Sequence, residues 1–187
     1  MYNLSTSELS TLAIIFGILI ITYFVLRSIF FPLLKKIAKR TSTFIDDFNI
    51  NILGCVKILQ AVLPRLQSSE SASVVFFSTV AVKLGMPFHS SVSASKGAIE
   101  GLTRSLAAEF APRIRVNAIA PGWVLTKKQI DKWATPDGLK AHLDRQCIKS
   151  HLKENDIAGG TLFLASSSSS MITGQLIAID GGVVMTG

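Results

Sequence analysis

The stretch from Val74 to Ala120, VVFFSTVAVKLGMPFHSSVSASKGAIEGLTRSLAAEFAPRIRVNAIA, predicts a strand, a helix and a second strand in succession. Val74–Phe77 is wholly apolar, which is typical of a parallel strand that is covered on both faces. A helix is expected from Ser93 to Phe110, and Arg115–Ala120 is the second strand, ended by Pro121-Gly122. Strands that alternate with helices indicate an α/β fold built on a parallel sheet.

The flanking sequence extends this pattern in both directions. Apolar residues recur at three- and four-residue steps between Phe44 and Leu66, which predicts one face of a helix. Asn155 can cap a helix that runs to about Ala165, and Gln175–Ile179 is expected to be a third strand. The connecting segments are the charged stretch 127–153 with short surface helices, the low-complexity loop Ser166–Ser170, and Asp180-Gly181-Gly182.

An uninterrupted apolar stretch, LAIIFGILIITYFVLRSIFF, runs from Leu12 to Phe31 with Arg27 as its one charge. Twenty residues in a helix cover about 30 Å, which matches the hydrocarbon thickness of a bilayer. We therefore expect one N-terminal transmembrane helix. A fully buried core helix is the alternative interpretation of this stretch.

The positive charge of the chain is concentrated next to this stretch. The formal net charge is +7, and residues 1–42 carry five basic side chains against one acidic side chain. Basic residues that flank a span stay cytoplasmic, which predicts a single-pass membrane protein with its N-terminus outside and its C-terminal domain in the cytoplasm. Membrane lipid rather than nucleic acid is the expected partner. The basic residues that follow the span are Lys35, Lys36, Lys39 and Arg40.

These features divide the chain into an anchor with a basic juxtamembrane segment, residues 1–43, and a folded domain, residues 44–187. The two cysteines, Cys55 and Cys147, have no CxxC or paired Cys/His spacing. Neither a metal site nor a disulfide scaffold is therefore expected in the domain.

Five motifs follow one another along residues 44–187. They are Asn51 in FNINILG, the turn Ser78-Thr79-Val80, SASKGAIEGLTRSLAAE from Ser93 to Glu109, RVNAIAPGWVLT ending at Thr126, and GQLIAIDGG. In this order they resemble the short-chain dehydrogenase/reductase family, over about three quarters of the chain. The resemblance implies a Rossmann-like, doubly wound parallel sheet and NAD(P)-dependent oxidoreduction of alcohols and ketones.

The resemblance also implies roles for individual residues. Thr79 takes the position of the family's catalytic serine, Lys96 that of its catalytic lysine, which also holds the nicotinamide ribose, and Asn51 that of its structural asparagine. Each has a structural alternative: Thr79 can cap a strand end, Lys96 can be a partly buried cation held by Asn51, and Asn51 can bridge a helix and a strand. The family's segment that contacts the nicotinamide amide corresponds to Pro121, Gly122, Val124 and Thr126. The alternative is that these residues only connect the end of a strand to the following loop.

Two departures from the family pattern bear on activity. The family's catalytic tyrosine precedes its lysine by four residues on one helical face, but here Val92 occupies that position. The two tyrosines of the sequence are Tyr2 and Tyr23. No GxxxGxG turn for the pyrophosphate is present, so the sheet is expected to be incomplete, without its N-terminal strands. NAD(P) binding is therefore expected to be weak or absent, with His89 as the one substitute proton donor.

Three functional hypotheses remain open at this point. The chain is a membrane-anchored oxidoreductase of this family, a non-catalytic relative that acts through association, or a fragment of a longer enzyme. A homo-oligomer is expected through the helices near 45–66 and 93–110, because in the family these two helices pair with their copies. The charged segment 127–153 does not identify a substrate, and His142 and His151 within it are expected to be surface residues.

Overall fold

The computed structural model describes Arg27, Ser28 and residues 44–185. The chain divides into two units, Met1–Thr43 and Phe44–Gly187. The predicted membrane span therefore lies outside the described residues, apart from Arg27 and Ser28. Within the residues that are described, no helix combines the length and the apolar character needed to cross a membrane.

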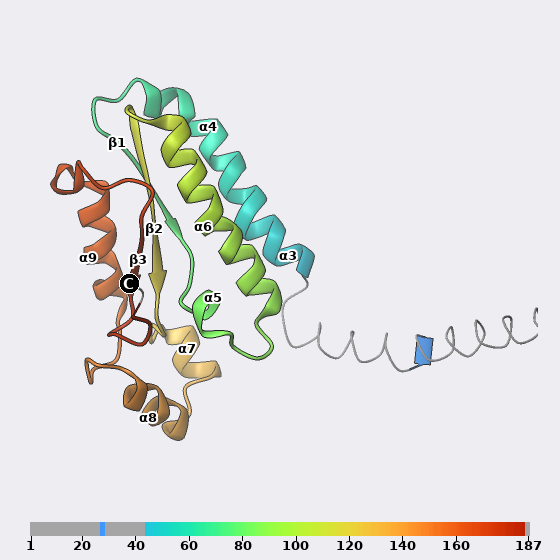
Figure 1. Ribbon diagram of the computed structural model, residues 1–187. Coiled ribbons are helices and arrows are strands. Elements are labelled where there is room, and N and C mark those ends of the chain that lie inside the picture. Colours follow the sequence, from blue (N-terminus) through green and yellow to red (C-terminus); the bar gives the residue numbers. More distant parts are fainter. Residues whose placement is uncertain (1–26, 29–43, 186–187) are drawn as a thin grey trace, which may run out of the picture. The chain divides into compact units, whose positions relative to one another are not determined.

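A parallel sheet of three strands forms the centre of the domain (Figure 1). The strands are β1 (Ala72–Phe77), β2 (Ile114–Pro121) and β3 (Leu176–Ile179), in the order β1-β2-β3. β1 pairs with β2 from Ala72↔Ile114 to Phe77↔Ile119, and β2 pairs with β3 from Ala118↔Leu176 to Pro121↔Ile179. Parallel neighbours need crossover connections, so this topology confirms the α/β sheet that the sequence predicted.

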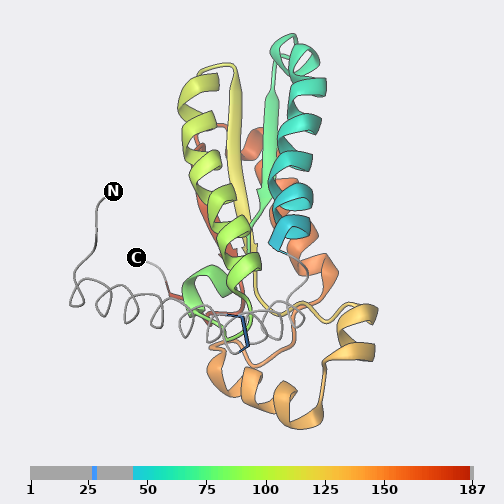
Figure 2. The same cartoon turned by 90° about the vertical axis from the view of Figure 1, so that its right-hand side faces the viewer.

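Helices cover both faces of the sheet (Figures 1 and 2). On one face, α6 (Ser90–Phe110) packs beside a helical run made of α3 (Phe44–Phe48), the π-helix η2 (Asn49–Gly54) and α4 (Cys55–Gln67). On the opposite face lies α9 (Glu154–Ala165). The core on the α6 side includes Leu59, Phe76, Ile99, Ala107, Val116 and Ala118.

The smaller elements gather where the strands end (Figure 1). They are α5 (Ala81–Leu84), which follows β1, and α7 (Lys127–Lys132) and α8 (Pro136–Arg145), which follow β2. Because β1, β2 and β3 are parallel, their carboxyl ends meet at this one edge of the sheet. The short helices confirm the prediction for residues 127–153.

Several boundaries differ from the sequence prediction for local reasons. α6 begins three residues earlier than expected, at Ser90, and Pro121 belongs to β2, where it pairs with Ile179. Asn155 is not the cap of α9. The cap is Lys153, whose backbone N–H donates to the Asp156 carboxylate at 2.7 Å.

The serine-rich stretch expected to be a loop is instead a 3₁₀ helix, η3 (Ser167–Ser169). The Ser169 hydroxyl is buried and lies 2.8 Å from the carbonyl oxygen of Phe163. The Arg115 guanidinium donates to the hydroxyl of Ser169 at 2.9 Å and to the carbonyl of Ser166 at 3.0 Å. A side chain from β2 thus fixes a segment whose composition alone indicated no structure.

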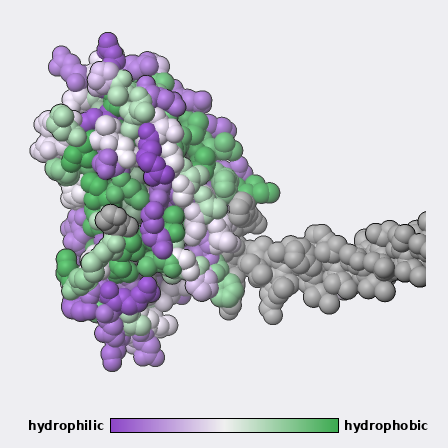
Figure 3. Space-filling model, viewed as in Figure 1, coloured by the Kyte–Doolittle hydropathy of each residue, from purple (hydrophilic) through white to green (hydrophobic). Residues whose placement is uncertain are grey.

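Large apolar side chains remain exposed on the helical run α3–η2–α4, and Figure 3 shows apolar surface over this region. Ile50 keeps 73% of its surface exposed and Ile58 keeps 67%. Within the described residues, β1 lies at an edge of the sheet and carries no charged residue or proline. Apolar edges of this kind invite pairing with another chain.

Candidate functional site

Most of the residues predicted to form a site lie at or just beyond the carboxyl ends of β1 and β2, whereas Lys96 and Asn51 lie on helices. Ligands of open α/β sheets bind at this edge. The N–H of Ser78 donates to the carbonyl of Ile119 at 2.8 Å, and the N–H of Val80 donates to the carbonyl of Pro121 at 3.2 Å. These two backbone bonds hold the loop that contains Thr79 beside the start of the Pro121–Thr126 segment.

Lys96 projects from α6 to the end of β1. Its Nζ donates to the carbonyl oxygen of Phe77 at 2.9 Å. Burial lowers the pKa of the Lys96 ammonium, while the nearby Cys55 thiol and Asp47 carboxylate act in the opposite direction. Val92 lies one helical turn before Lys96, so an aliphatic side chain stands where the family has a phenol.

A buried network that the sequence analysis missed lies behind Lys96. The Ser78 hydroxyl lies 3.0 Å from Oε1 of Glu100 and 3.2 Å from the carbonyl oxygen of Lys96. Glu100 is only 5% exposed, and its Oε2 lies 3.7 Å from Nζ of Lys83. The signal in the sequence was an acidic residue one turn after Lys96 on the inward face of α6, but only packing shows which hydroxyl it meets.

Asn51 does not hold Lys96, contrary to one of the alternatives drawn from the sequence. It lies in the π-helix η2, and its Nδ2 donates to the Ser95 hydroxyl at 3.0 Å. Ser95 in turn donates to the carbonyl of Val92 at 3.1 Å. Close by, the Ser91 hydroxyl donates to Asp47 at 2.6 Å. These bonds join α3 and η2 to the first turns of α6, so Asn51 bridges two helices.

Thr79 lies two residues before the short helix α5, whose N-cap is Val80. The Thr79 hydroxyl accepts a hydrogen bond from the N–H of Ala81 at 3.3 Å, and its carbonyl accepts one from Val82 at 3.3 Å. These contacts are with the first residues of α5, so the Thr79 side chain supports the start of a helix rather than the end of a strand. A hydroxyl keeps further hydrogen-bonding capacity when it accepts one bond, so this contact leaves a donor for a substrate carbonyl.

The segment from Pro121 to Thr126 is shaped by close backbone contacts. The N–H of Gly122 donates to the carbonyl of Ile179 at 2.9 Å. A Cβ atom at Gly122 would lie 2.8 Å from Cα of Asp180 and 2.9 Å from Cδ1 of Leu152, so only glycine fits there. Val124 forms an isolated parallel bridge with Leu152. The chain therefore turns tightly against the end of β3.

Thr126 closes this segment as the N-cap of α7. Its hydroxyl accepts a hydrogen bond from the N–H of Gln129 at 3.3 Å, which satisfies one of the free donors at the start of the helix. The side chain of Gln129 in turn accepts a bond from the Trp123 indole at 2.9 Å. Of the predicted cofactor positions, Pro121, Gly122, Val124 and Thr126 are thus contiguous on one loop, and Lys96 lies on the neighbouring helix.

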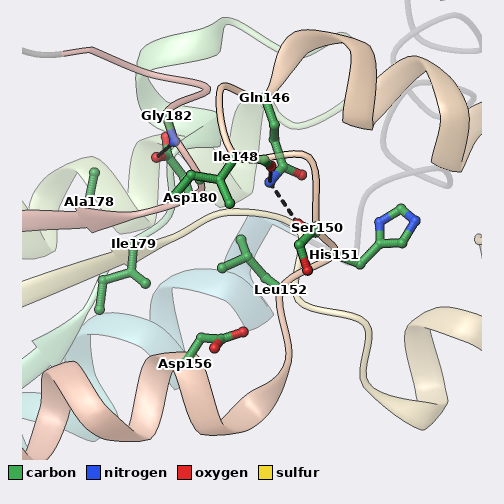
Figure 4. Close-up of a pocket in the computed structure, with 11 residues that line it drawn as sticks. Gln146, Ile148, Ser150, His151, Leu152, Asp156, Ala178, Ile179, Asp180 and Gly182 are labelled. Atoms are coloured by element: carbon green, nitrogen blue, oxygen red, sulfur yellow. Dashed lines mark hydrogen bonds between the residues drawn. The ribbon is translucent and has the colours of Figure 1, made fainter.

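A cavity of about 430 Å³ lies beside this loop, between the end of β3 and the segment before α9 (Figure 4). Asp180 and Leu152, which contact Gly122, line it. Figure 4 shows the Gln146 amide directed at Ser150, to whose carbonyl its Nε2 donates at 3.1 Å. None of the predicted site residues lines this cavity.

His142 and His151 are partly buried rather than surface residues, which corrects the sequence prediction. The His142 ring meets Trp123 edge-on, with the ring centroids 5.3 Å apart. Burial lowers the pKa of His142, and the positive charge of Arg145 and the neighbouring His151 act in the same direction. The indole of Trp123 covers the histidine only in the folded chain, which is why a charged segment of sequence gave no sign of this burial.

The family model described as enoyl-(acyl carrier protein) reductase matches residues 34–184. A probable galactose dehydrogenase of Rhizobium meliloti is 41% identical over 139 residues, covering 74% of this chain and 54% of that protein. D-xylose 1-dehydrogenase of Caulobacter vibrioides is 36% identical over 149 residues, covering 79% of this chain and 60% of that protein. The chain therefore spans somewhat more than half the length of these relatives.

Solved structures give the same result. A short-chain glucose/ribitol dehydrogenase from Brucella melitensis matches with a TM-score of 0.68 and 28% identity, over 78% of this chain and 56% of its own. A 4-hydroxyisoleucine dehydrogenase complexed with NADH matches with a TM-score of 0.67 and 27% identity, over 73% of this chain and 57% of its own. Because the family model covers most of the residues and the fold agrees, the chain belongs to the short-chain dehydrogenase/reductase family.

Proposed function

We propose that this chain carries the nicotinamide-facing side of a short-chain dehydrogenase/reductase site but does not by itself reduce carbonyl compounds at a meaningful rate. The observation that supports this most directly is Val92, one turn before Lys96. A positioned acid or base is typically worth about 10²–10⁴ in rate, and an isopropyl group supplies neither.

The residues that are present fit one end of an NAD(P) molecule. Lys96 and the contiguous loop Pro121–Thr126 would hold the nicotinamide and its ribose, and Gly122 lets the backbone pass close to β3. When bound, the cofactor would supply the hydride. Thr79 would donate a hydrogen bond to the substrate carbonyl, but neither Val92 nor the Lys96 amine held on Phe77 is a phenol that could protonate the alkoxide.

Among the described residues near Val92, His89 is the candidate to replace the phenol. It lies just before α6, and its Nδ1 is 2.8 Å from the carbonyl oxygen of Pro87. That contact fixes the ring in the loop, with Nδ1 as the donor in the tautomer that satisfies the carbonyl. We therefore include His89→Ala among the variants that test the proposal.

The proposal is tested by measuring nucleotide binding and turnover separately on the full chain in detergent. Calorimetry with NADH and NADPH is expected to give no binding in the micromolar range, because the sequence has no glycine-rich turn for the pyrophosphate. Val92→Tyr, with Val92→Phe as the matched control without the hydroxyl, is expected to remain inactive on sugar, aliphatic and steroid-like carbonyl compounds. Turnover in the unaltered chain that is abolished by Lys96→Ala or His89→Ala would contradict the proposal.

We further propose that residues 1–43 anchor the chain in a membrane, with the N-terminus outside and residues 44–187 in the cytoplasm. The apolar stretch Leu12–Phe31 and the basic cluster after it support this. The chain is expected to stay with the membrane fraction through carbonate and high-salt washes, whereas a chain that lacks residues 1–40 is expected to leave it. Release of the full chain by salt alone, or protection of residues 44–187 from protease on the cytoplasmic side, would refute the proposal.

A non-catalytic role in association is a second candidate, favoured by the exposed apolar side chains of α4 and by the small residues of α6. We propose a homo-oligomer through the helices near 45–66 and 93–110. Replacing Ile58, which is largely exposed, by aspartate is expected to convert the oligomer to a monomer in detergent, because charge at an apolar interface stays unpaired. Ile148→Asp is the matched control, since this equally exposed isoleucine lies outside both helices. A monodisperse monomer of the unaltered chain would contradict the proposal.

A further inference from the structure

The surroundings of the Lys96 amine differ from those of two other lysines of the domain, Lys83 and Lys127. Lys83 lies 3.7 Å from Glu100 and Lys127 lies 3.0 Å from Asp131. Among the described residues no carboxylate lies within 4.0 Å of Nζ of Lys96. Its hydrogen bond goes to a neutral acceptor, the carbonyl of Phe77. A half-buried ammonium without an ion pair is stabilised less than an exposed or paired one.

The position on α6 gives this amine an aliphatic neighbour. Val92 lies one turn before Lys96 and is itself only partly exposed. A phenol in that position would share a proton with the lysine, but a valine offers no polar atom. The bond to Phe77 occupies one N–H direction, which leaves the lone pair of the neutral amine free to react when the third proton is lost.

We propose that Lys96 is a nucleophilic amine that captures small aldehydes as imines. Its half-buried position favours small carbonyl compounds over large ones. In the first step the ammonium releases a proton to water and the Nζ lone pair attacks the carbonyl carbon, forming a C–N bond. The resulting carbinolamine then loses its hydroxyl group and the nitrogen proton as water, and a C=N bond remains.

The electrostatics of the site agree with this reactivity. Burial lowers the pKa of Lys96, so a larger share of the amine is neutral near pH 7 than for a lysine in water. The charge interactions with Cys55 and Asp47 act in the opposite direction and are smaller than the effect of burial. Desolvation is one of the ways in which enzymes activate a lysine for Schiff-base formation.

The test uses the full chain in detergent, labelled briefly with ¹³C-formaldehyde and a borane reductant that traps each imine as a methylamine. Peptide mass spectrometry gives the labelling rate of each lysine between about pH 6 and pH 10. The midpoint of the pH profile is compared rather than the absolute rate, because partial burial slows access of the reagent at every pH. Lys96 is expected to reach its midpoint at lower pH than the exposed lysines Lys57 and Lys140.

A matched pair of variants then tests the local cause. Val92→Asp places a carboxylate one turn before Lys96 and is expected to move the midpoint of Lys96 upward, since an opposite charge favours the ammonium. Val92→Asn has nearly the same shape without the charge and is expected to leave it low. Lys96→Arg is expected to lose the label at this position.

The inference is overturned if Lys96 shares the midpoint of Lys57 and Lys140 in the unaltered chain. That comparison needs no variant, so it decides the matter even if Val92→Asp does not fold. An unchanged midpoint in folded Val92→Asp would also contradict the inference. Because labelling needs neither nucleotide nor turnover, its result is separate from that of the proposed lack of reductase activity.

Discussion

The two sides of the candidate site are built in different ways. At the end of β1, the arrangement depends on side chains: Ser78 lies beside Glu100, and Lys96 donates to the carbonyl of Phe77. At the end of β2, it depends on the backbone: Gly122 donates to Ile179 and passes so close to Asp180 that a Cβ does not fit.

This difference explains how the family's framework can persist while its reactive group does not. Val92 stands in the position of the catalytic phenol, yet α6, the loop after β1 and the loop after β2 keep their hydrogen bonds. None of those bonds needs a hydroxyl at position 92. The backbone-built side, at the end of β2, sets the shape of the site. The side-chain-built side, at the end of β1, sets its chemistry.

The comparison predicts that the backbone-built side is the less tolerant of substitution. Gly122→Ala is expected to destabilise the chain by about 3 kcal/mol, the upper part of the range for overpacking, because two of its close contacts are with Asp180 in the neighbouring backbone turn. Gly159→Ala, in α9 and outside the proposed oligomer helices, is the control, since no heavy atom lies within 4 Å of a Cβ there, and it is expected to stabilise by about 0.5–1 kcal/mol. Urea unfolding midpoints measure both, and a neutral Gly122→Ala would remove the distinction.

On the side-chain-built side, the largest stability effect is expected at Ser78. Ser78→Ala removes a hydrogen-bond partner from the buried Glu100 carboxylate and is expected to cost about 1.5 kcal/mol. Glu100→Gln keeps an acceptor for the hydroxyl and loses only the ion pair with half-exposed Lys83, so it is expected to cost less. The two variants are compared by urea unfolding. Equal losses would show that charge rather than the hydroxyl fixes this loop.

Thr126 belongs to the backbone-built side but acts through its hydroxyl. Thr126→Ala is expected to destabilise the chain by about 1 kcal/mol, because the N-cap of α7 is lost. Thr126→Ser retains the accepting oxygen and is expected to stay within a few tenths of a kcal/mol of the unaltered chain. Thermal unfolding distinguishes them, and a serine variant as unstable as the alanine variant would assign the effect to the lost methyl group.

The smallest expected effect is on pH dependence and concerns His142 beside Trp123. The folded-state pKa of His142 is lowered, so the unfolded chain binds more protons and stability falls as the pH drops below about 6.5. His142→Gln is expected to flatten this slope in urea unfolding measured at several pH values. A slope that persists unchanged in the variant would place the titrating group elsewhere.

Most of the framework could be predicted from the sequence because it rests on local, periodic signals. The apolar run Val74–Phe77 and the helix that ends at Phe110 both lie where the pattern placed them. The short helices of 127–153 follow from charge and turn residues. The failures have identifiable causes: the cap of α9 depends on a carboxylate three residues further on, and η3 depends on Arg115 from a distant strand.

The candidate site, like the framework, could be predicted from the sequence only in part. Motif order identified Lys96, Thr79 and the loop Pro121–Thr126, and it showed that position 92 is a valine. It could not show that Asn51 bonds to Ser95 rather than to Lys96, because both are neighbours on one helix and only the approach of η2 decides between them. The roles of these residues in binding and catalysis stay predictions.

The sequence by itself determined the alternation of strands and helices, the family and the valine four residues before Lys96, since these depend on the identity and order of residues. The tertiary structure alone decided which polar groups meet: Glu100 with Ser78, and the Lys96 amine with the carbonyl of Phe77. The partners in each pair lie 22 and 19 positions apart, on α6 and at the end of β1. Folding brings them together because burial of the apolar faces of α6 and β1 fixes the distance between the two elements.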